Sequence, residues 1–385
     1  MNGTSGTTSS AVATAQDNHS STSEMNHANP PEPVLLQTPK KKLTSLTLVS
    51  MNVANCEPSA EAPKSWTTQE VTQAIQHELL QSQPDILALQ ECPSLDWAAS
   101  AFEEHGYRVV GHRGAHAGYV ALLVLDTLPK EYGVVVENLS TTEYRKLPAV
   151  VASLHIPLSN NSNNNDNDNN NQSTTLLIAS VHLAPFRGGN WDRRAQMESL
   201  LELARPHALI VAGDTNMREE EDSVMEDELG LLDAWKQAGS HPSTKFTWDT
   251  RNHLQNATAA TLSGRIHNTL QGLVGGAAAS PSTMAQTTTT DTDTNEEGYF
   301  NRYYGSSTRE YATRYDRIYI SLAHKDDNQQ QHQTSVRARN NEKVNAAKVE
   351  VDYFGLIANK PVTPPSRTHF LSDHFGITCT FKIDV

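Results

Sequence analysis

The segment ALIVAGDTNMRE at residues 208–219 joins a short apolar run to a group of polar side chains. Residues 208–212 are all apolar, which is typical of a strand that is buried on both faces. Gly213, Asp214 and Asn216 follow this run directly. A polar side chain placed after a buried strand costs free energy unless it is hydrogen-bonded or takes part in function. The segment therefore predicts a buried strand whose end carries chemistry.

The same arrangement occurs at other strand ends along the chain. Polar side chains of the Asp, Asn, Glu or His type flank four more apolar runs, namely Asn52, Glu91, His182 and the pair Asp373 and His374. Taken singly, each has an ordinary explanation as a turn, a helix cap or a structural histidine. Together, and in this order, they favour strand ends that converge on one metal-assisted site.

The order of the predicted elements indicates an α/β fold. Strand-like patterns cover residues 43–53, 85–90, 107–111, 119–125, 149–157, 175–183, 208–212, 315–321, 348–354 and 375–383. Helical spacing covers residues 67–81, 93–105 and 191–204, with Thr67 or Thr68 as the N-cap of the first helix. This mixture predicts two sheets packed together with helices on the outside. The pattern leaves the order of strand pairing open.

Composition separates the folding part of the chain from low-complexity segments. Residues 1–42 contain few large apolar side chains, so we expect a disordered N-terminal tail. A catalytic domain is predicted for residues 43–385, interrupted by low-complexity insertions at about 159–173, 255–300 and 325–345. The domain keeps enough chain outside these insertions to build a substantial core.

Charge and cysteine content argue against several classes of function. The chain has 385 residues and a net charge of -14, which is unlike a protein that coats DNA non-specifically but allows a few local phosphate contacts. Its three cysteines are far apart, so neither a zinc site nor a disulfide framework is expected. No membrane span or secretory signal is expected. Lysines 40–42 form a basic cluster that fits a linker or a nuclear signal.

The residue types at these strand ends suit the hydrolysis of a phosphodiester. Mg²⁺ prefers hard oxygen ligands and neutralises charge on phosphate oxygens, and Glu91 is the candidate ligand. A carboxylate can orient or deprotonate the attacking water, and we assign that role to Asp214. Imidazoles supply hydrogen bonds or positive charge to phosphate oxygens, which suits His182 and His374. Two amides can donate hydrogen bonds without adding negative charge, namely Asn52 and Asn216.

Short motifs resemble the successive signatures of the endonuclease/exonuclease/phosphatase superfamily. They are MN at 51–52, LQE at 89–91, HL at 182–183, GDTN at 213–216 and SDH at 372–374. Longer matches are similar to the tyrosyl-DNA phosphodiesterase 2 group of that superfamily, namely AGDTNMRE at 212–219, DAWKQAG at 233–239, FTWDT at 246–250, RYDRIYI at 314–320 and FLSDHFG at 370–376. TWDT is the most specific element, because generic members do not usually carry it.

This resemblance implies a fold and an activity. The fold would be DNase I-like, a four-layer α/β sandwich of two mixed β-sheets flanked by helices. The activity would be Mg²⁺-dependent hydrolysis of the 5′-phosphotyrosyl bond between DNA and a trapped topoisomerase 2, with Mn²⁺ as a substitute ion. The partners would be DNA 5′ ends with tyrosyl or topoisomerase 2 adducts, and no membrane. A monomer is expected, in the nucleus and also in the cytoplasm.

The resemblance also implies roles for individual residues. Asn52 and Glu91 would belong to the phosphate and Mg²⁺ site, beside His182, and Asp214 would be the catalytic carboxylate. Asn216 and His374 would stabilise the transition state, with Asp316 supporting this network. DNA contacts would come from the Arg218 side chain, from the aromatic wall of Trp248 and Tyr315, and from Tyr119 on a strand beside the site.

Two further expectations concern the surroundings of these DNA contacts. Thr247 and Asp249 indicate that Trp248 lies in a partly exposed turn, where an aromatic face could stack on any base. Arg187 and Arg193 are candidate phosphate contacts, because both follow the His182 strand.

The sequence departs from the family pattern at two places. Met51 stands where the family has tryptophan, and residues 184–186 (Ala-Pro-Phe) replace a polar stretch. The second change removes a hydrogen-bond donor near the phosphate and puts substrate preference in doubt. Another phosphoesterase activity therefore stays open, as an abasic endonuclease, an RNA 3′ exonuclease or a sphingomyelinase-like enzyme. A non-catalytic module that binds DNA ends is the alternative outside enzymes.

Overall fold

The computed structural model describes residues 41–57, 67–139, 147–158, 173–249, 312–322, 347–359 and 371–385. All of them belong to one compact unit, Lys40–Val385. The predicted tail, apart from residues 41 and 42, lies outside the described residues. The same holds for the three predicted insertions, except that Ser173 is described and already begins a strand.

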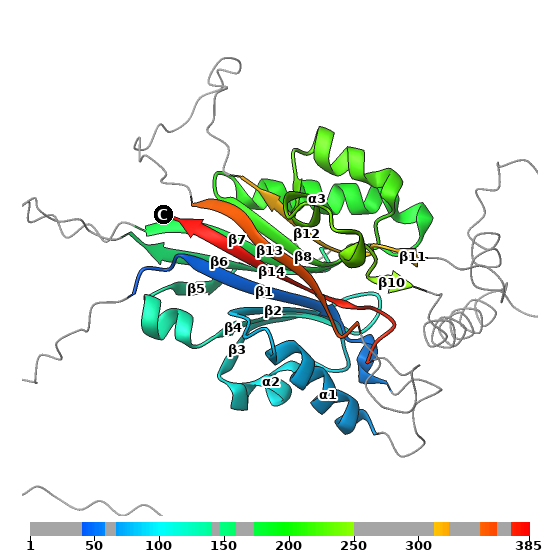
Figure 1. Ribbon diagram of the computed structural model, residues 1–385, viewed down its shortest axis with the longest axis horizontal. Helices are drawn as coiled ribbons and strands as arrows, with labels where there is room; N and C mark the ends of the chain where they lie inside the picture. The colour runs from blue at the N-terminus through cyan, green and yellow to red at the C-terminus, as the bar shows by residue number, and fades with distance from the viewer. Residues whose placement is uncertain are drawn as a thin grey trace, which may run out of the picture. The chain divides into compact units, whose positions relative to one another are not determined.

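The first of two six-stranded sheets has the strand order β13–β14–β1–β2–β4–β3 (Figure 1). Its strands are β1 (Ser45–Asn52), β2 (Ile86–Cys92), β3 (Tyr107–Gly114), β4 (Tyr119–Leu125), β13 (Lys348–Ile357) and β14 (Gly376–Asp384). Strands β1 and β2 are parallel, and all other neighbours in this sheet are antiparallel.

The second sheet has the order β5–β6–β7–β8–β12–β9. Its strands are β5 (Val135–Asn138), β6 (Ala149–Pro157), β7 (Ser173–His182), β8 (Ala208–Asp214), β9 (Leu232–Asp233) and β12 (Asp316–Ser321). Strands β7 and β8 are parallel, and the other pairs are antiparallel. A separate two-stranded ribbon pairs β10 (Trp248–Asp249) with β11 (Ala312–Thr313).

The two sheets share one plan, with a central parallel pair joined by a helix. Helix α1 (Thr68–Leu80) connects β1 to β2, and α3 (Asn190–Ala204) connects β7 to β8. In the pairing register, Asn52 lies opposite Gln90 and His182 lies opposite Asp214. The ends of both parallel pairs therefore carry polar residues, as the sequence predicts. The sequence did not reveal this repeated plan.

The described unit has four layers, which confirms the predicted fold class. Inward-facing apolar residues of both sheets, such as Leu48 and Ile210, form one core between the sheets. On the outer faces, α1 and α2 (Trp97–Phe102) cover the first sheet and α3 covers the second (Figure 1). Strand β1 contributes Leu46 and Leu48 to the inner core and Val49 to the outer one, because alternate side chains of a strand face opposite sides.

Helix boundaries follow local sequence signals. Thr67 caps α1 in a capping box with Glu70, which confirms the predicted start of this helix. The helix predicted for residues 93–105 is shorter, because α2 passes into a 3-10 turn, Glu103–His105, that stops at Gly106 with φ 81°. None of the described helices is long and apolar enough to cross a membrane.

The sequence did not predict the short elements, because they contain too few residues to show the periodic spacing of apolar side chains. They are β5, β9, β10, β11, helix α4 (Ala234–Gln237), the 3-10 turns Ala54–Cys56, Arg187–Gly189, Glu219–Glu221 and Pro242–Thr244, and the π turns Leu128–Tyr132 and Val224–Glu228. All three cysteines are free and buried.

Candidate active site

Asn52 links the two sheets at the ends of their parallel strands. Its Nδ2 donates to Glu91 Oε1 at 2.9 Å and to Asp214 Oδ2 at 3.1 Å. Its Oδ1 accepts the backbone N–H of Ala54 at 3.0 Å, which fixes the orientation of the amide. The sequence prediction that Asn52, Glu91 and Asp214 converge is therefore correct.

Glu91 lies in a β-bulge of β2. The pairing of β2 with β4 shifts register between Leu89 and Cys92, and Glu91 has a φ of 52°. A left-handed conformation at a residue other than glycine costs about 1–3 kcal/mol and persists where surrounding structure enforces it. The bulge turns the Glu91 side chain towards the site with 17% of its surface exposed. Burial raises the pKa of Glu91 to about 7.

Asp214 is positioned by the residues on either side of it. Gly213 has a φ of 151°, and a Cβ at this position would lie 2.0 Å from Val181 O, so only glycine fits beside β7. On the other side, the Asn216 N–H donates to Asp214 Oδ1 at 2.9 Å, as in an Asx turn. The Asn216 amide donates to Leu183 O at 3.2 Å. The backbone of the GDTN motif, at Gly213 and Asn216, therefore fixes the position of the Asp214 side chain.

His374 forms a buried pair with Asp316. His374 Nδ1 donates to Asp316 Oδ2 at 2.8 Å, and His374 Nε2 lies 3.8 Å from Asp214 Oδ2. Burial alone would lower the pKa of His374, but the charges of Asp316 and Asp214 raise it well above its usual value. Burial likewise acts to raise the pKa of Asp214, but the charge of His374 and the hydrogen bonds from Asn52 and the Asn216 N–H lower it below its usual value. The imidazole is thus charged and Asp214 ionised at neutral pH.

The SDH motif has a local structural role as well. Ser372 Oγ donates to Asn52 O at 2.7 Å and accepts the His374 backbone N–H at 3.2 Å. The Asp316 backbone N–H donates to Thr247 Oγ1 at 3.0 Å. These bonds connect the end of β1, the His374 loop and the start of β12.

His182 is buried between the two carboxylates. Its Nε2 lies 3.4 Å from Asp214 Oδ2 and 3.8 Å from Glu91 Oε1. Burial lowers the pKa of His182 to about 3, so its imidazole is neutral. His116, which sequence reasoning missed, lies against it with ring centroids 3.9 Å apart. Its position between two predicted strands, just before Gly118 and Tyr119, is the only sequence signal for it.

The arrangement fits a divalent cation. Ligand atoms of Glu91, His182 and Asp214 lie within 4.8 Å of one another, and the same holds for Asp214, Asp316 and His374. The three carboxylates of these groups meet one charged side chain, His374. Clustered carboxylates without matching cations favour a hard metal ion. The partly exposed Glu91 is the ligand best placed to share such an ion with solvent and substrate.

The predicted aromatic wall lies beside His374. The Tyr315 ring centroid is 6.3 Å from that of His374 and 5.7 Å from that of Trp248. Trp248 is 4% exposed and lies in β10, so the expectation of a partly exposed turn is wrong. Because Trp248 is packed in a strand and Tyr315 is also buried, base stacking by this pair stays a prediction.

The predicted basic contacts occupy different environments. The Arg218 guanidinium lies 5.5 Å from the Tyr315 ring centre and donates to Phe186 O and Asn216 O. Arg187 is on the surface, 3.5 Å from Glu220. Arg193 is fully buried and pairs with Glu221 at 2.7 Å, so the expectation that it contacts phosphate is wrong.

Tyr119 begins β4 next to the Glu91 bulge. It pairs with Cys92, the residue after Glu91, and is partly exposed. This agrees with its predicted place on a strand beside the site.

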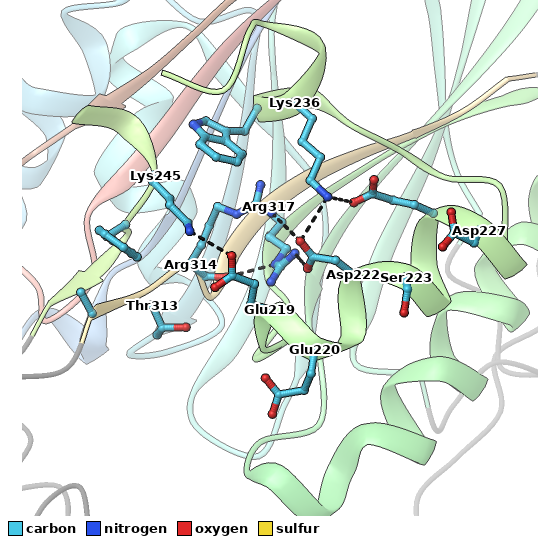
Figure 2. A pocket seen from close by; sticks show the side chains of 14 residues that line it. Glu219, Glu220, Asp222, Ser223, Asp227, Lys236, Lys245, Thr313, Arg314 and Arg317 are labelled. Carbon is cyan, nitrogen blue, oxygen red and sulfur yellow. Dashed lines mark hydrogen bonds and ion pairs between the residues drawn. The ribbon is translucent and has the colours of Figure 1, made fainter. Parts of the chain in front are cut away.

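A second charged cluster lies on the outer face of the second sheet, and two of its carboxylates, Asp222 and Glu226, line the pocket shown in Figure 2. Asp222, Glu226 and Asp233 could hold a metal ion by position alone. However, Arg314 lies 2.5 Å from Asp233 and 3.3 Å from Asp222, and Arg317 also pairs with Asp222. Lys236 pairs with Glu226 at 2.5 Å. Each carboxylate therefore already has a cation, and this cluster is structural.

The model of the Endonuclease/Exonuclease/phosphatase family matches residues 49–374. The 5′-tyrosyl-DNA phosphodiesterase of Caenorhabditis elegans is 29% identical over 184 residues, which cover 46% of this chain and 46% of that protein. The enzyme of the same name from Caenorhabditis briggsae is 29% identical over 43% of this chain and 44% of its own length. The chain thus spans about half the length of these relatives.

Among solved structures, the crystal structure of TDP2 from C. elegans is 20% identical to this chain. It superposes with a TM-score of 0.48, covering 89% of this chain and 76% of that one. The crystal structure of D. rerio TDP2 complexed with single strand DNA product is 15% identical, with a TM-score of 0.48 and coverage of 88% and 99%.

Proposed function

The chain belongs to the endonuclease/exonuclease/phosphatase family, and we propose that it is a metal-dependent phosphodiesterase that hydrolyses 5′-phosphotyrosyl bonds of DNA. Its place would be in DNA repair, where the bond joins DNA to a trapped topoisomerase 2. The names of its two nematode relatives support this substrate. Residence in the nucleus is part of the same proposal.

One observation carries the proposal more than any other. The Asn52 amide donates to both Glu91 and Asp214, so a partly exposed carboxylate and a buried ionised one lie on either side of a single nitrogen. The first suits a metal ligand that solvent and substrate can reach, and the second suits a base. Hydrolysis of a phosphodiester with a metal ion uses both roles, because one carboxylate holds the ion and another accepts the proton of the attacking water.

Glu91 would hold the cation, with Mg²⁺ as the proposed ion and Mn²⁺ as a substitute. When bound, the ion would supply positive charge to a phosphate oxygen. Asp214 accepts a proton from the attacking water as the water oxygen bonds to phosphorus. The bond from phosphorus to the tyrosyl oxygen breaks, and this oxygen leaves with its electron pair as a phenolate that takes a proton from solvent.

The histidines and amides assist the same step. His374, held and charged by Asp316, is placed to donate to a phosphate oxygen as negative charge develops there. Asn52 and Asn216 keep Asp214 in its orientation through the bonds described above. His182 stays neutral, so it does not neutralise the carboxylates that hold the cation.

The DNA strand would leave the site past the aromatic and basic side chains next to His374. Arg218 would contribute charge, and Trp248 and Tyr315 would provide the aromatic surface. Tyr119 and Arg187 would extend this path at its borders. Since an aromatic surface accepts any base, such a path suits an enzyme that acts on DNA ends of any sequence.

The test is a comparison of substrates with purified protein. Release of tyrosine from a single-stranded oligonucleotide with a 5′-phosphotyrosyl end is measured with Mg²⁺, with Mn²⁺ and with EDTA. An abasic duplex and an RNA with a 3′ tail are tested in parallel. We expect metal-dependent release of tyrosine at a rate well above that for the other two. Cleavage of the abasic duplex or the RNA in preference would reject the proposed substrate, and no cleavage by folded protein would reject the enzyme.

A further inference from the structure

The turn between β3 and β4 is fixed against the backbone of the candidate metal ligand. Its residues 115–118 close with a hydrogen bond from the Ala115 N–H to Gly118 O at 3.1 Å. Gly118 has a φ of 61°, and a Cβ there would lie 2.8 Å from Cys92 O and 2.9 Å from the carbonyl carbon of Glu91. Only glycine allows this close approach. The turn is therefore a rigid support next to the Glu91 bulge.

His116 belongs to this turn, and its ring lies against the ring of His182. The ring centroids of the two histidines are 3.9 Å apart with an interplanar angle of 56°. Burial lowers the pKa of His116, and the negative charge of Asp214 opposes this shift. His116 is exposed to solvent, whereas His182 is fully buried. A substrate entering the site would meet His116 first.

The ring of His116 can also donate a hydrogen bond to a ligand. Within the described parts of the chain, no hydrogen bond engages either of its ring nitrogens. The two amides at the centre are occupied, because the Asn52 amide binds Glu91 and Asp214 and the Asn216 amide binds Leu183 O. The segment after His182, residues 184–186, is Ala-Pro-Phe and offers no side-chain donor. His116 therefore adds a donor to those of His374, His182 and Arg218.

We propose that His116 is a further substrate-contacting residue, whose imidazole N–H donates a hydrogen bond to an oxygen of the scissile phosphate group. A neutral imidazole carries one N–H, so the contact does not depend on protonation of the ring. The assignment rests on the proposed function only in taking the ligand to be a phosphate at the 5′ end of a DNA strand.

Three variants separate contact with the substrate from support of His182. His116→Phe keeps a ring against His182 and removes the N–H donor. His116→Gln keeps an N–H donor and removes the ring. His112→Ala is the matched control, since His112 is an exposed histidine on β3 of the same hairpin.

Binding is measured by fluorescence anisotropy with two oligonucleotides in Mg²⁺, one with a 5′-phosphate and one with a 5′-hydroxyl. We expect His116→Phe to weaken binding of the 5′-phosphate strand about tenfold, the effect of one hydrogen bond to a charged group. Binding of the 5′-hydroxyl strand should not change. His116→Gln should recover part of the loss, and His112→Ala should match the wild type.

Several outcomes would overturn the assignment. Binding of the 5′-phosphate strand by His116→Phe at wild-type strength would remove the phosphate contact, and so would an equal loss of binding for both strands. A wild type that does not distinguish the two strands would do the same. If the wild type distinguishes them but releases no tyrosine, the proposed function fails while the binding result still decides the role of His116.

Discussion

Strand β12 carries a buried charged cluster on each of its two faces, and the two clusters differ in charge balance. Asp316 faces inwards, where it meets His374 near Asp214. The next residue, Arg317, faces outwards, where it pairs with Asp222. Both sides contain a group of acidic residues whose oxygens could surround a metal ion. Proximity of carboxylates therefore does not identify a metal site.

Charge balance separates the two faces. On the outer face, Arg314, Arg317 and Lys236 pair with the carboxylates (Figure 2). On the inner face, three carboxylates meet the single charged imidazole of His374. Buried charge without a partner is costly and is retained where function needs it. We therefore assign a structural role to the outer cluster (Asp222, Glu226 and Asp233) and a catalytic role to the inner cluster (Glu91, Asp214 and Asp316).

The largest expected effect is on catalysis, from a change in the inner cluster. Asp214→Asn removes the base, so the rate of tyrosine release under saturating substrate should fall about 10²–10⁴-fold. The midpoint of thermal unfolding should also fall, because a carboxylate whose pKa is lowered in the folded state stabilises the fold at neutral pH, so the rate is measured well below that midpoint. A rate within tenfold of the wild type would show that Asp214 is not the base.

A substitution in the outer cluster should lower the stability of the fold. Arg317→Met removes a buried arginine that pairs with Asp222 and leaves Arg314 and Lys236 as the remaining cations of this carboxylate, so the free energy of unfolding should fall by about 3 kcal/mol, the lower end for a broken buried pair. Urea denaturation measures this change, with Lys382→Met as a control at an exposed pair with Asp352. A loss below about 1 kcal/mol, as for a surface ion pair, would contradict the structural role of the outer cluster.

The same cluster gives a smaller, pH-dependent effect. Burial acts to raise the pKa of Asp222, but Arg317, Arg314 and Lys236 lower it below its usual value of 3.8. A carboxyl whose pKa is lower in the folded state stabilises the protein above its unfolded pKa and loses this contribution as pH falls through the folded pKa.

Asp222→Asn should therefore be less stable than the wild type at pH 7, by roughly 2 kcal/mol for its charged hydrogen bonds. This difference should shrink as pH falls below the usual pKa of 3.8. Urea unfolding of both proteins across this range measures it. A difference that stays constant with pH would mean that the Asp222 charge does not stabilise the fold.

The sequence predicted what local patterns encode. The central strands, their helices and the polar residues at their ends are visible in the sequence because burial on both faces leaves continuous apolar runs, as in residues 208–212, although the pairing of these strands is not. The place of Glu91 near Asp214 followed from the same reasoning. The bulge that aims Glu91 is not visible, since it depends on the register with β4.

Contacts between distant segments explain the remaining errors. Arg193 looked available for phosphate, but it pairs with Glu221 across 28 positions of the chain. Trp248 looked exposed, but its pairing with Thr313 places it in a strand. His116 was overlooked because its value depends on how the β3–β4 turn packs on Glu91 and Cys92. Such pairings set exposure and charge balance, and no local pattern reports them.

Metal binding tests the comparison of the two clusters most directly. The midpoint of thermal unfolding is measured with and without Mg²⁺ for the wild type, for Glu91→Gln in the inner cluster and for Glu226→Gln in the outer one. Mg²⁺ at about 100 times its dissociation constant should stabilise the wild type by about 2.7 kcal/mol. The account predicts that Glu91→Gln loses this shift and Glu226→Gln keeps it. A shift that survives Glu91→Gln, or that disappears with Glu226→Gln, would contradict it.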